Sequence, residues 1–560
     1  MSGAVPVSLP DPEMELAGAP SWDVTAPVGA VGDSVTVATW TILSRVTGFV
    51  RIAIVAAVLG ATFFGNNYQF TNSLPNLVYY GFLAGSLFSS LLVPALVRHI
   101  DGGDSRAAER VASGLFGVVA LGMLAALPLA ILVAPELLRL ASLGSHSAAS
   151  AGQVRVGRLL VAMLMPQILF YGVIGTSTAV QNAHRRFALA AGAPVLENLG
   201  TIAVLLVTWS LFPKVPDPAQ VPLAELLLLG LGSTAAVGLH ASAQWWGARR
   251  VGVVLRPRAG WRDPEVRVVI HRAVPSLVQA GAAATELIVL LLLADRVAGG
   301  VVALQIALNF YFLPVAIAAT PVALSLIPRL SRIDAHSPDF HDTLVRGLVF
   351  AGFLTLPAAA GYVVLAGPLG RAISLGNMNH SAAIGLVVTA LRYLAPGLIG
   401  EAAFLILTYA SYSRGDTATP LRAMGVQFIV CLGVAAISLW VHGSEALAVL
   451  GAALSAGTLA GTVVLYAMVT RRHRGQERLA PPLGRVALGA ALMVGPAWFT
   501  ATSLSRGVSG RLGTEVAAVA AVLVGIAVFV GSQLLWRSRE LQWVAASLGV
   551  RLSRRIAPDD

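Results

Sequence analysis

The chain has 560 residues, of which 56% are hydrophobic and 12% are charged, and its mean hydropathy is +0.77. A soluble globular domain carries roughly 25% charged residues, so this composition argues against a string of soluble domains and predicts one all-α polytopic membrane protein. The formal net charge of +11 does not indicate a nucleic-acid partner, because the arginines form short clusters between apolar stretches.

The sequence lacks the motifs of common catalytic and nucleotide-binding sites. Its only lysine, Lys214, is followed by Val215, so no P-loop, in which GxxxxGK precedes Ser or Thr, exists. The single cysteine, Cys431, permits neither an internal disulfide nor a cysteine metal cage. HExxH, GxSxG and paired CxxC motifs are absent as well. We therefore expect a protein that is not an enzyme and that needs no cofactor or metal.

Residues 1–34 open the chain with a segment rich in Pro, Gly and Ala. No basic stretch precedes an apolar core there, so the segment does not have the pattern of a signal peptide. We expect a disordered cytoplasmic tail.

About fourteen apolar runs follow, each close to the length that crosses a bilayer as a helix. About twenty apolar residues are needed, because only the hydrogen bonds within a helix satisfy the backbone where water is absent. The predicted spans are 35–59, 68–97, 111–134, 156–180, 188–211, 223–247, 272–294, 301–327, 345–366, 382–410, 423–441, 446–470, 485–505 and 513–535.

Two arginines lie near the middle of the first predicted span. Arg45 and Arg51 are too deep for a guanidinium to reach the headgroups easily, and each would cost about 2.5–3.5 kcal/mol if it faced lipid. Their spacing corresponds to about 240° of helical rotation, so both can share one broad face towards protein or a water-filled cavity. Such a lining would attract an anionic group, since guanidinium binds phosphate through paired hydrogen bonds. A structural pair held by helix-end carbonyls or a buried carboxylate is the alternative.

The second predicted span carries a polar stripe around a helix breaker, Pro75. Such a pattern is tolerated where a helix bends and lines a cavity. The stripe of the second span consists of Asn66, Asn67, Gln69, Asn72 and Asn76.

The eighth span is marked by a further pair of prolines, Pro314 and Pro321.

Four more ionisable residues fall inside apolar runs: Glu197, Glu286, Glu401 and Arg392. A carboxyl group in such a place is a candidate carrier of a coupling proton, and Glu286 and Glu401 are our candidates for this role. Glu197 follows Pro194 and is expected to hydrogen-bond locally at a helix break.

The basic residues of the predicted loops are distributed unevenly between the two sides of the membrane. Alternate loops place about 27 of them on one side and about 8 on the other, a bias that predicts cytoplasmic positions for both termini. Trp245, Trp246 and Trp536 fall at the same interface, as aromatic anchors do. Residues 536–560 have the pattern of a basic amphipathic helix that lies on an anionic leaflet, although a solvated tail fits nearly as well.

Several segments resemble the MurJ (MviN) family of bacterial lipid II flippases. The similarity begins with SRVTGFVR at 44–51, LPNL at 74–77 and GSLFS at 85–89. It continues with PQI at 166–168, QNA at 181–183, APVLEN at 193–198 and YSRGDTATP at 412–420. The resemblance covers about residues 35–535.

This resemblance implies two six-helix lobes around a central cavity, an N-lobe at 35–247 and a C-lobe at 272–470. It also implies that two further helices, at 485–535, form a groove for a lipid tail. The expected activity is alternating access in the bacterial plasma membrane, with the pyrophosphate and sugar headgroup crossing through the cavity. The implied partners are an anionic lipid-linked glycan, membrane lipids and the cell-wall synthesis machinery.

The resemblance also implies a substrate site. Arg45 and Arg51 match two arginines that the family uses for its anionic substrate, and Asn76 belongs to the matching proline motif. We therefore expect these three residues in the substrate site.

Three positions depart from the family. Tyr79 and Asn309 stand where the family has arginines, and Asn66 stands where an aspartate is usual. These residues are also expected in the substrate site, with Arg392 as a candidate replacement for a missing positive charge.

The departures leave more than one function open. The first hypothesis is a lipid II flippase with a rearranged cavity. The second is a flippase for another lipid-linked glycan precursor, and a third is a non-transporting scaffold of the cell envelope. A drug or cation antiporter of the same superfamily is disfavoured, because it would need acidic residues where Arg45 and Arg51 lie.

Overall fold

The computed structural model describes residues 28–79, 81, 92–141, 149–334, 337–471, 477–507 and 511–542. Most of the predicted N-terminal tail, at 1–27, and most of the predicted C-terminal tail, at 543–560, lie outside these residues. The GSLFS motif at 85–89 and part of the second predicted span also lie outside them.

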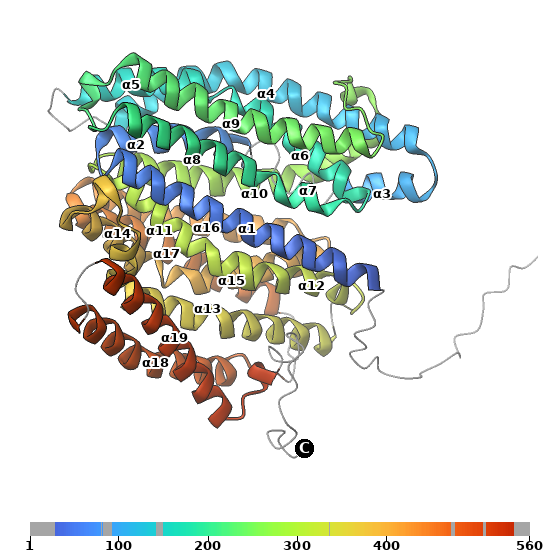
Figure 1. Cartoon of the computed structure of the whole chain (residues 1–560). Helices are drawn as coiled ribbons and strands as arrows, with labels where there is room; N and C mark the ends of the chain where they lie inside the picture. Colours follow the sequence, from blue (N-terminus) through green and yellow to red (C-terminus); the bar gives the residue numbers. More distant parts are fainter. Residues whose placement is uncertain are drawn as a thin grey trace, which may run out of the picture.

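Every regular element in the described part of the chain is a helix (Figure 1). The first half contains α1 (Val28–Leu59), α2 (Phe63–Val78), α3 (Val93–Asp101), α4 (Ser105–Ala141), α5 (Ala149–Leu164), α6 (Gln167–Ala183), α7 (Phe187–Gly192), α8 (Pro194–Leu211), η3 (Pro218–Gln220) and α9 (Leu223–Arg250). The second half begins with η4 (Gly260–Arg262), α10 (Pro264–Ala294), α11 (Gly300–Pro314), η5 (Val315–Ala319), α12 (Thr320–Leu330) and α13 (Pro338–Ile373). It continues with η6 (Gly376–Met378), α14 (Ser381–Leu394), α15 (Gly397–Ser413), α16 (Ala418–Ala435), η7 (Ala436–Leu439), α17 (Gly443–Thr470), α18 (Ala480–Gly507) and α19 (Arg511–Leu535).

The all-α polytopic fold predicted from the sequence is confirmed. Within the described residues, 12 helices are long and apolar enough to cross a membrane, and the pair α14 and α15, bent by 47°, brings the number to 13. The remaining predicted span, 68–97, contains parts of α2 and α3, with residues 80 and 82–91 between them outside the described part.

The helices divide into two groups and a C-terminal pair. Helices α1 to α9, the first group, pack chiefly with one another, and so do α10 to α17, the second group. Figure 1 shows the first group in the upper part of the molecule and the second below it, with α1 running along the boundary. Helices α18 and α19 pack together and contact α13, so this pair is attached to the side of the second group.

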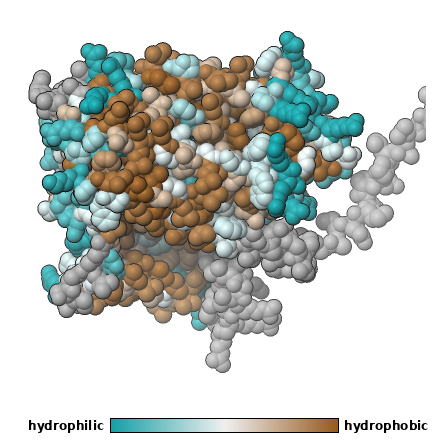
Figure 2. Space-filling model, turned by 45° about the horizontal axis from the view of Figure 1, so that its top comes forward, coloured by the Kyte–Doolittle hydropathy of each residue, from teal (hydrophilic) through white to brown (hydrophobic). Residues whose placement is uncertain are grey.

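The outer surface is apolar where the helices would meet lipid. Leu132, Ile429 and Val463 are examples of large apolar side chains that stay mostly exposed. In Figure 2, hydrophobic residues cover the broad middle of the visible face, and hydrophilic residues gather at its left and right edges. Exposing so wide an apolar band to water would cost free energy, so this surface is suited to a lipid bilayer.

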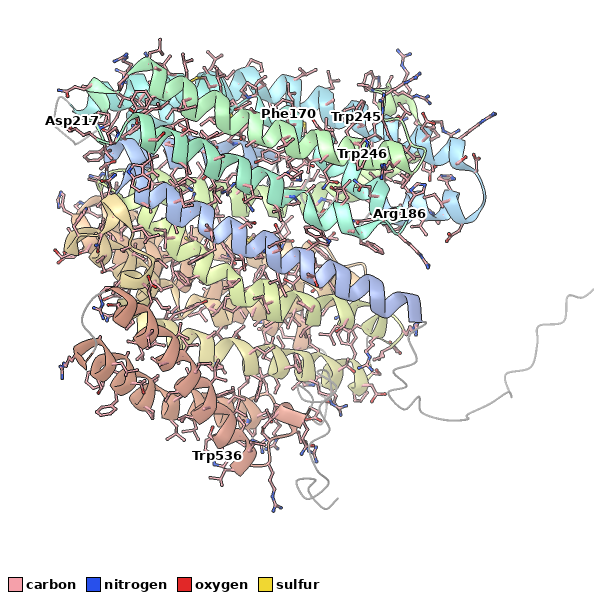
Figure 3. The ribbon with its side chains drawn as sticks, viewed as in Figure 1. Phe170, Arg186, Asp217, Trp245, Trp246 and Trp536 are labelled. Atoms are coloured by element: carbon pink, nitrogen blue, oxygen red, sulfur yellow. The ribbon has the colours of Figure 1, made fainter. Side chains whose placement is uncertain are left out.

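The two ends of the bundle differ in charge. Arg186, Trp245 and Trp246 lie at one end, together with the arginines between α9 and α10, and we call it the basic end (Figure 3). Asp217 lies at the opposite end, which we call the far end. This segregation follows the uneven loop charges of the sequence.

Proline interrupts two helices beside the boundary between the groups. Pro75 lies inside α2, and Pro314 ends α11 just before the π-helical turn η5. Proline cannot donate a backbone hydrogen bond to the preceding turn, so the helix loosens there and frees carbonyl groups. The Val315 carbonyl accepts from both the Thr320 backbone amide and the Thr320 hydroxyl, the latter at 3.2 Å.

Candidate functional site: a cavity between the two helix groups

A cavity of about 850 Å³ lies between the two groups of helices. Its walls come from α1, α2, α6, α8 and α9 on one side and from α10, α11, η5, α12 and α15 on the other. It reaches Thr41 on α1 and Thr320 on α12, and these parts of both helices lead towards the basic end. The loosened turn η5 forms part of the wall.

Both arginines of the first span line this cavity. The side chain of Arg51 is 24% exposed, and Arg45 is more exposed. Between them in sequence, Phe49 packs edge-on against Phe310 of α11, with ring centroids 5.0 Å apart. The two arginines therefore share a face that points into the cavity and away from lipid.

Arg51 is paired with a carboxylate. Its guanidinium lies 3.4 Å from Glu197 Oε1 on α8, and the hydroxyl of Tyr171 donates to the same oxygen at 3.4 Å. The other oxygen, Oε2, lies 2.9 Å from Nδ1 of His240 on α9. Within the described part of the chain, no hydrogen bond or ion pair involves the Arg45 guanidinium, so its charge is open to the cavity.

Glu197 was expected to hydrogen-bond locally at a helix break, and that expectation was wrong. Its partners come from three other helices, α1, α6 and α9. The sequence did not single out Tyr171 or His240. His240 lies 43 residues beyond Glu197, and no sequence pattern indicates that the two helices bring them together.

The polar stripe of α2 is divided between the cavity and the protein interior. Gln69, Asn72 and Asn76 line the cavity, as does Asn309 of α11. Asn67 is fully buried and is not part of the wall. Helix α2 thus turns one polar face to the cavity and keeps Asn67 inside the protein.

The two helix groups also meet at the far end, beyond the cavity. The side-chain amide of Asn66 donates to the Val297 carbonyl at 2.8 Å, and the Val301 backbone amide donates to Asn66 Oδ1 at 3.0 Å. The side chain of Asn377, in η6, donates to the Val58 carbonyl at 2.8 Å. These contacts close the far end, because they join the first group to η6 and to the loop between α10 and α11.

Three residues predicted for the substrate site lie elsewhere. Asn66 is fully buried in the far-end contact, and Tyr79 is fully buried and stacked on Tyr171 with centroids 5.6 Å apart. Arg392 is exposed on α14 and is not part of the cavity wall, so it supplies no replacement charge there. Asn66 lies beyond the cavity along α2, Tyr79 packs inside the first group, and α14, which carries Arg392, contributes no described residue to the cavity wall.

The two candidate coupling carboxylates form a separate cluster inside the second group. Glu286 on α10 is 1% exposed and accepts a hydrogen bond from Nε2 of Gln427 on α16 at 3.2 Å. The Tyr311 hydroxyl donates to Glu401 on α15 at 3.4 Å. Neither carboxylate lines the cavity, so the structure separates them from the arginines.

These features define a class of protein. An all-helical membrane protein with two helix groups, a polar cavity between them and one end closed has the architecture of a transporter of the alternating-access kind. A family model described as "Lipid II flippase MurJ" matches residues 55–544. The chain belongs to the MurJ family.

Relatives and solved structures resemble this chain along most of its length. A protein of Vibrio cholerae described as "Probable lipid II flippase MurJ" is 26% identical, over 90% of this chain and 97% of its own length. A solved structure of a lipid II flippase MurJ in an inward closed conformation superposes with a TM-score of 0.68 at 16% identity, covering 90% of this chain and 98% of that one. A multidrug resistance MATE family transporter of the MOP superfamily, in an inward-facing conformation, gives a TM-score of 0.59 at 12% identity, covering 76% and 94%.

Proposed function

We propose that this chain carries lipid II, the undecaprenyl-pyrophosphate-linked peptidoglycan precursor, from the cytoplasmic to the outer leaflet of the bacterial plasma membrane. The observation that supports this most directly is the pair Arg45 and Arg51 in a large cavity between the two helix groups. Guanidinium groups recognise phosphate through short, charge-assisted hydrogen bonds, and a low-dielectric wall strengthens them. Asn76 and Asn309, which line the same cavity, are suited to the sugar and peptide groups because amides donate and accept.

The arginines have different tasks in this proposal. Arg45 is open, so it makes the first contact with the pyrophosphate. Arg51 is occupied by Glu197, so the substrate must displace this carboxylate before Arg51 can bind it. Glu197 keeps a partner after the exchange, because His240 still contacts its other oxygen. The ion pair between Arg51 and Glu197 thus re-forms when the substrate leaves, which favours release.

The proposed carrier works by moving its two lobes, 35–247 and 272–470, relative to each other. The cavity extends towards the basic end and the far end is closed. We assign the basic end, with both termini, to the cytoplasm, since arginine-rich loops resist translocation. In the other state the far-end contacts open, and the headgroup leaves there while its lipid tail stays in the membrane, beside the helices of 485–535.

The topology is tested by labelling from outside the cell. Asp217 and Arg186 are both exposed, at opposite ends of the bundle, and the native Cys431 is buried. A membrane-impermeant maleimide added to intact cells, or to spheroplasts where an outer barrier exists, should label Asp217→Cys. It should leave Arg186→Cys unlabelled until the cells are lysed. The reverse pattern would contradict the assignment.

Coupling to an ion is a further part of the proposal. Glu286 and Glu401 lie in the interior of the second lobe, and a carboxyl group there can hold a proton in one state and release it in the other. Their separation from the cavity means that they would act on the lobe's packing and not on the substrate. The contacts that such a change would alter are those of Glu286 with Gln427 and of Glu401 with Tyr311.

The experiment that tests the main proposal is rescue of a bacterial strain depleted of its only lipid II flippase. Wild type should restore growth and the appearance of lipid II on the outer face. Arg45→Ala and Arg51→Ala should not, although both reach the membrane at wild-type levels. Rescue by both variants would overturn the cationic-cavity mechanism.

A second candidate is a flippase for another lipid-linked glycan precursor, and Asn309 favours it. This neutral residue lines the cavity where the family usually has an arginine, so the cavity holds fewer positive charges. Competition between lipid II and other purified lipid-linked precursors for the isolated protein separates the two candidates. A scaffold role beside the cell-wall synthesis machinery would instead predict that the arginine variants keep full function.

A further inference from the structure

A second pocket, of about 560 Å³, lies at the basic end of the molecule. It is bounded by α4 of the first helix group and by η4 and the start of α10. Three arginines line it, Arg110, Arg258 and Arg262, together with the acids Asp263 and Glu265. The cavity between the two helix groups shares none of these residues.

The walls of this pocket are fixed by backbone contacts. The Arg258 backbone amide donates to the Ser113 carbonyl on α4 at 3.3 Å, and the Arg256 amide donates to the Ser113 hydroxyl at 3.4 Å. Gly114 of α4 and Gly260 of η4 approach so closely that a Cβ on Gly260 would overlap the Gly114 backbone. In this arrangement the segment therefore packs directly on α4.

Both acids of the pocket are already occupied. Asp263 accepts a hydrogen bond from the backbone amide of Glu265 at 2.9 Å and lies 3.3 Å from Nε of Arg110. The Glu265 carboxylate lies 2.8 Å from Nε2 of His99 and 3.8 Å from the Arg98 guanidinium. Neither acid is therefore available to a further cation.

Arg258 and Arg262 are left with no internal neutralising group. Within the described residues, no hydrogen bond or ion pair involves either guanidinium. Two planar, permanently charged donors beside one rigid hollow are suited to an oxyanion, and phosphate is an anion whose geometry guanidinium matches well.

The surroundings of the pocket are those of a membrane–water interface. The neighbouring Trp245 and Trp246 carry stacked arginines, with Arg249 at 3.7 Å and Arg250 at 3.8 Å from the ring centroids. Tryptophan gathers at the interface where phospholipid headgroups lie. Figure 3 shows both tryptophans at this end of the bundle.

We propose that this pocket binds a phosphate group, presented by an anionic phospholipid headgroup or by a free phosphate ion, separately from the transported substrate. One wall of the pocket belongs to the first helix group, and the other leads directly into α10. A phosphate bound by Arg258 and Arg262 would lie between α4 and the start of α10. Occupancy favours the arrangement in which α10 starts against α4, which makes the site a control point on the movement of the lobes. This last consequence rests on the proposed carrier function, whereas the binding itself does not.

The test compares two double variants of the full-length protein in detergent, with native mass spectrometry and a binding titration. Arg258→Gln with Arg262→Gln removes the two free charges of the pocket. Arg256→Gln with Arg267→Gln is the matched control, because both of those arginines are exposed, lie in the same stretch of chain and do not line the pocket. The probes are short-chain phosphatidylglycerol, phosphatidylcholine of the same chain length, and sodium phosphate.

Wild type should bind phosphatidylglycerol in preference to phosphatidylcholine. The pocket variant should bind it at least tenfold more weakly, as expected for the loss of one or two charge-assisted hydrogen bonds, and the control variant within about twofold of wild type. If millimolar sodium phosphate displaces the lipid, a free phosphate is the ligand source; if it does not, the headgroup is.

Equal losses in both double variants would show that the attraction is diffuse surface charge, and would overturn the proposal. So would unchanged binding in the pocket variant. Equal gel-filtration profiles and melting temperatures of the variants exclude unfolding as the cause of a loss. The outcome is the same whichever lipid-linked substrate the cavity carries.

Discussion

The two cavity arginines differ in how much of their charge is available. Arg45 makes no ion pair within the described residues, whereas Arg51 shares Glu197 with Tyr171 and His240. Because Glu197 is only 14% exposed, water screens this pair weakly, and a competing anion must offer comparable hydrogen bonds. In the proposed function, substrate binding is an exchange of partners for Arg51 and a new contact for Arg45.

The exchange can be tested at Glu197. Glu197→Gln keeps the size of the side chain but removes the negative charge that competes for Arg51. We expect the affinity for a lipid-linked pyrophosphate to rise by roughly tenfold, as for one charge-assisted hydrogen bond, and translocation to slow because release is no longer assisted. Binding to the purified protein and flux in liposomes measure the two effects separately.

A matched control for this variant is Glu225→Gln. Glu225 is also in the first helix group and is 2% exposed, but it does not line the cavity. Its substitution should leave substrate affinity unchanged. If Glu197→Gln weakened binding as much as Arg51→Ala does, Glu197 would be a support that orients Arg51, and the exchange would be ruled out.

The identity of residue 66 also matters for the far-end contact. Asn66 both donates to a carbonyl and accepts from an amide in the far-end contact. An ionised aspartate could only accept, and it would face the Val297 and Asp295 carbonyls, from which it would be repelled. Asparagine is therefore consistent with a closed far end, and its presence says nothing about the charge of the cavity.

At the scale of elements, the far-end contact joins the start of α2 to the loop between α10 and α11. Asp295, the first residue of this loop, is 4% exposed, and its carboxyl lies near Asn66. Burial raises the pKa of Asp295 from 3.8 to about 7, although the hydrogen bond with Asn66 opposes this. The neutral acid is thus the form that fits the closed end.

The sign of the resulting pH dependence follows from that shift. In the open state the carboxyl returns to water and its pKa to the ordinary value of 3.8, whereas in the closed state the pKa is about 7. Closure is therefore fully favoured below the lower of these pKa values. As the pH rises from 3.8 to about 7, the closed state becomes less stable relative to the open state. The ratio of closed to open molecules falls by up to about tenfold per pH unit in this range. Asp295→Asn should remove this dependence.

Spin labels on Asp217→Cys and Asn379→Cys, one on each helix group at the far end, would report the opening as a distance distribution. Both residues are exposed, so labels there disturb no buried contact. As the pH is raised through the window between the two pKa values of Asp295, the longer distance should gain population. The distribution should stay constant when Asp295→Asn is added. A pH response that survives Asp295→Asn would assign it to another group.

The helix breaks act at this scale as well. The π-helical turn η5, which follows Pro314, forms part of the cavity wall. A regular α-helix at this place would have its backbone hydrogen bonds in the uniform i to i−4 pattern. The sequence marked this span by its two prolines. It did not predict the form of the break, in which the Thr320 hydroxyl binds the Val315 carbonyl, because prolines alone do not distinguish a kink from a π-helical turn.

At the scale of the whole molecule, transport requires that the closed end opens. Gly60→Cys with Asn377→Cys tests this directly, because a Cβ placed on Gly60 would lie 3.0 Å from Asn377 Cβ. A small adjustment gives the separation of a disulfide, which is about 3.8 Å between Cβ atoms. Oxidation should stop translocation, and reduction should restore it.

Each single cysteine variant is the control for the loss of the native residue. Gly60 has a φ of +67°, a conformation that costs a cysteine about 1–2 kcal/mol, so Gly60→Cys alone must be shown to fold and transport. Both single variants should remain active under oxidising conditions, and the native Cys431 is buried and should not react. A cross-linked protein that still translocates its substrate at the wild-type rate would mean that the headgroup does not pass through the far end.

The sequence by itself determined the membrane-embedded helical fold, the positions of most spans and the segregation of arginine to one end. These properties depend on the cost of placing polar groups in hydrocarbon, which acts on each segment separately. The same cost indicated that Arg45 and Arg51 must face the interior, and they line the cavity.

Only the tertiary structure decided which buried residues meet. Arg51, Glu197 and His240 come together from three helices. Asn66 lies in the far-end contact, and Arg392 is exposed on α14. Hydropathy places a residue at a depth in the membrane but does not specify how a helix is rotated against its neighbours. That rotation is set by side-chain packing between helices far apart in sequence, and it determines whether a buried charge lines a cavity, joins two lobes or faces outwards.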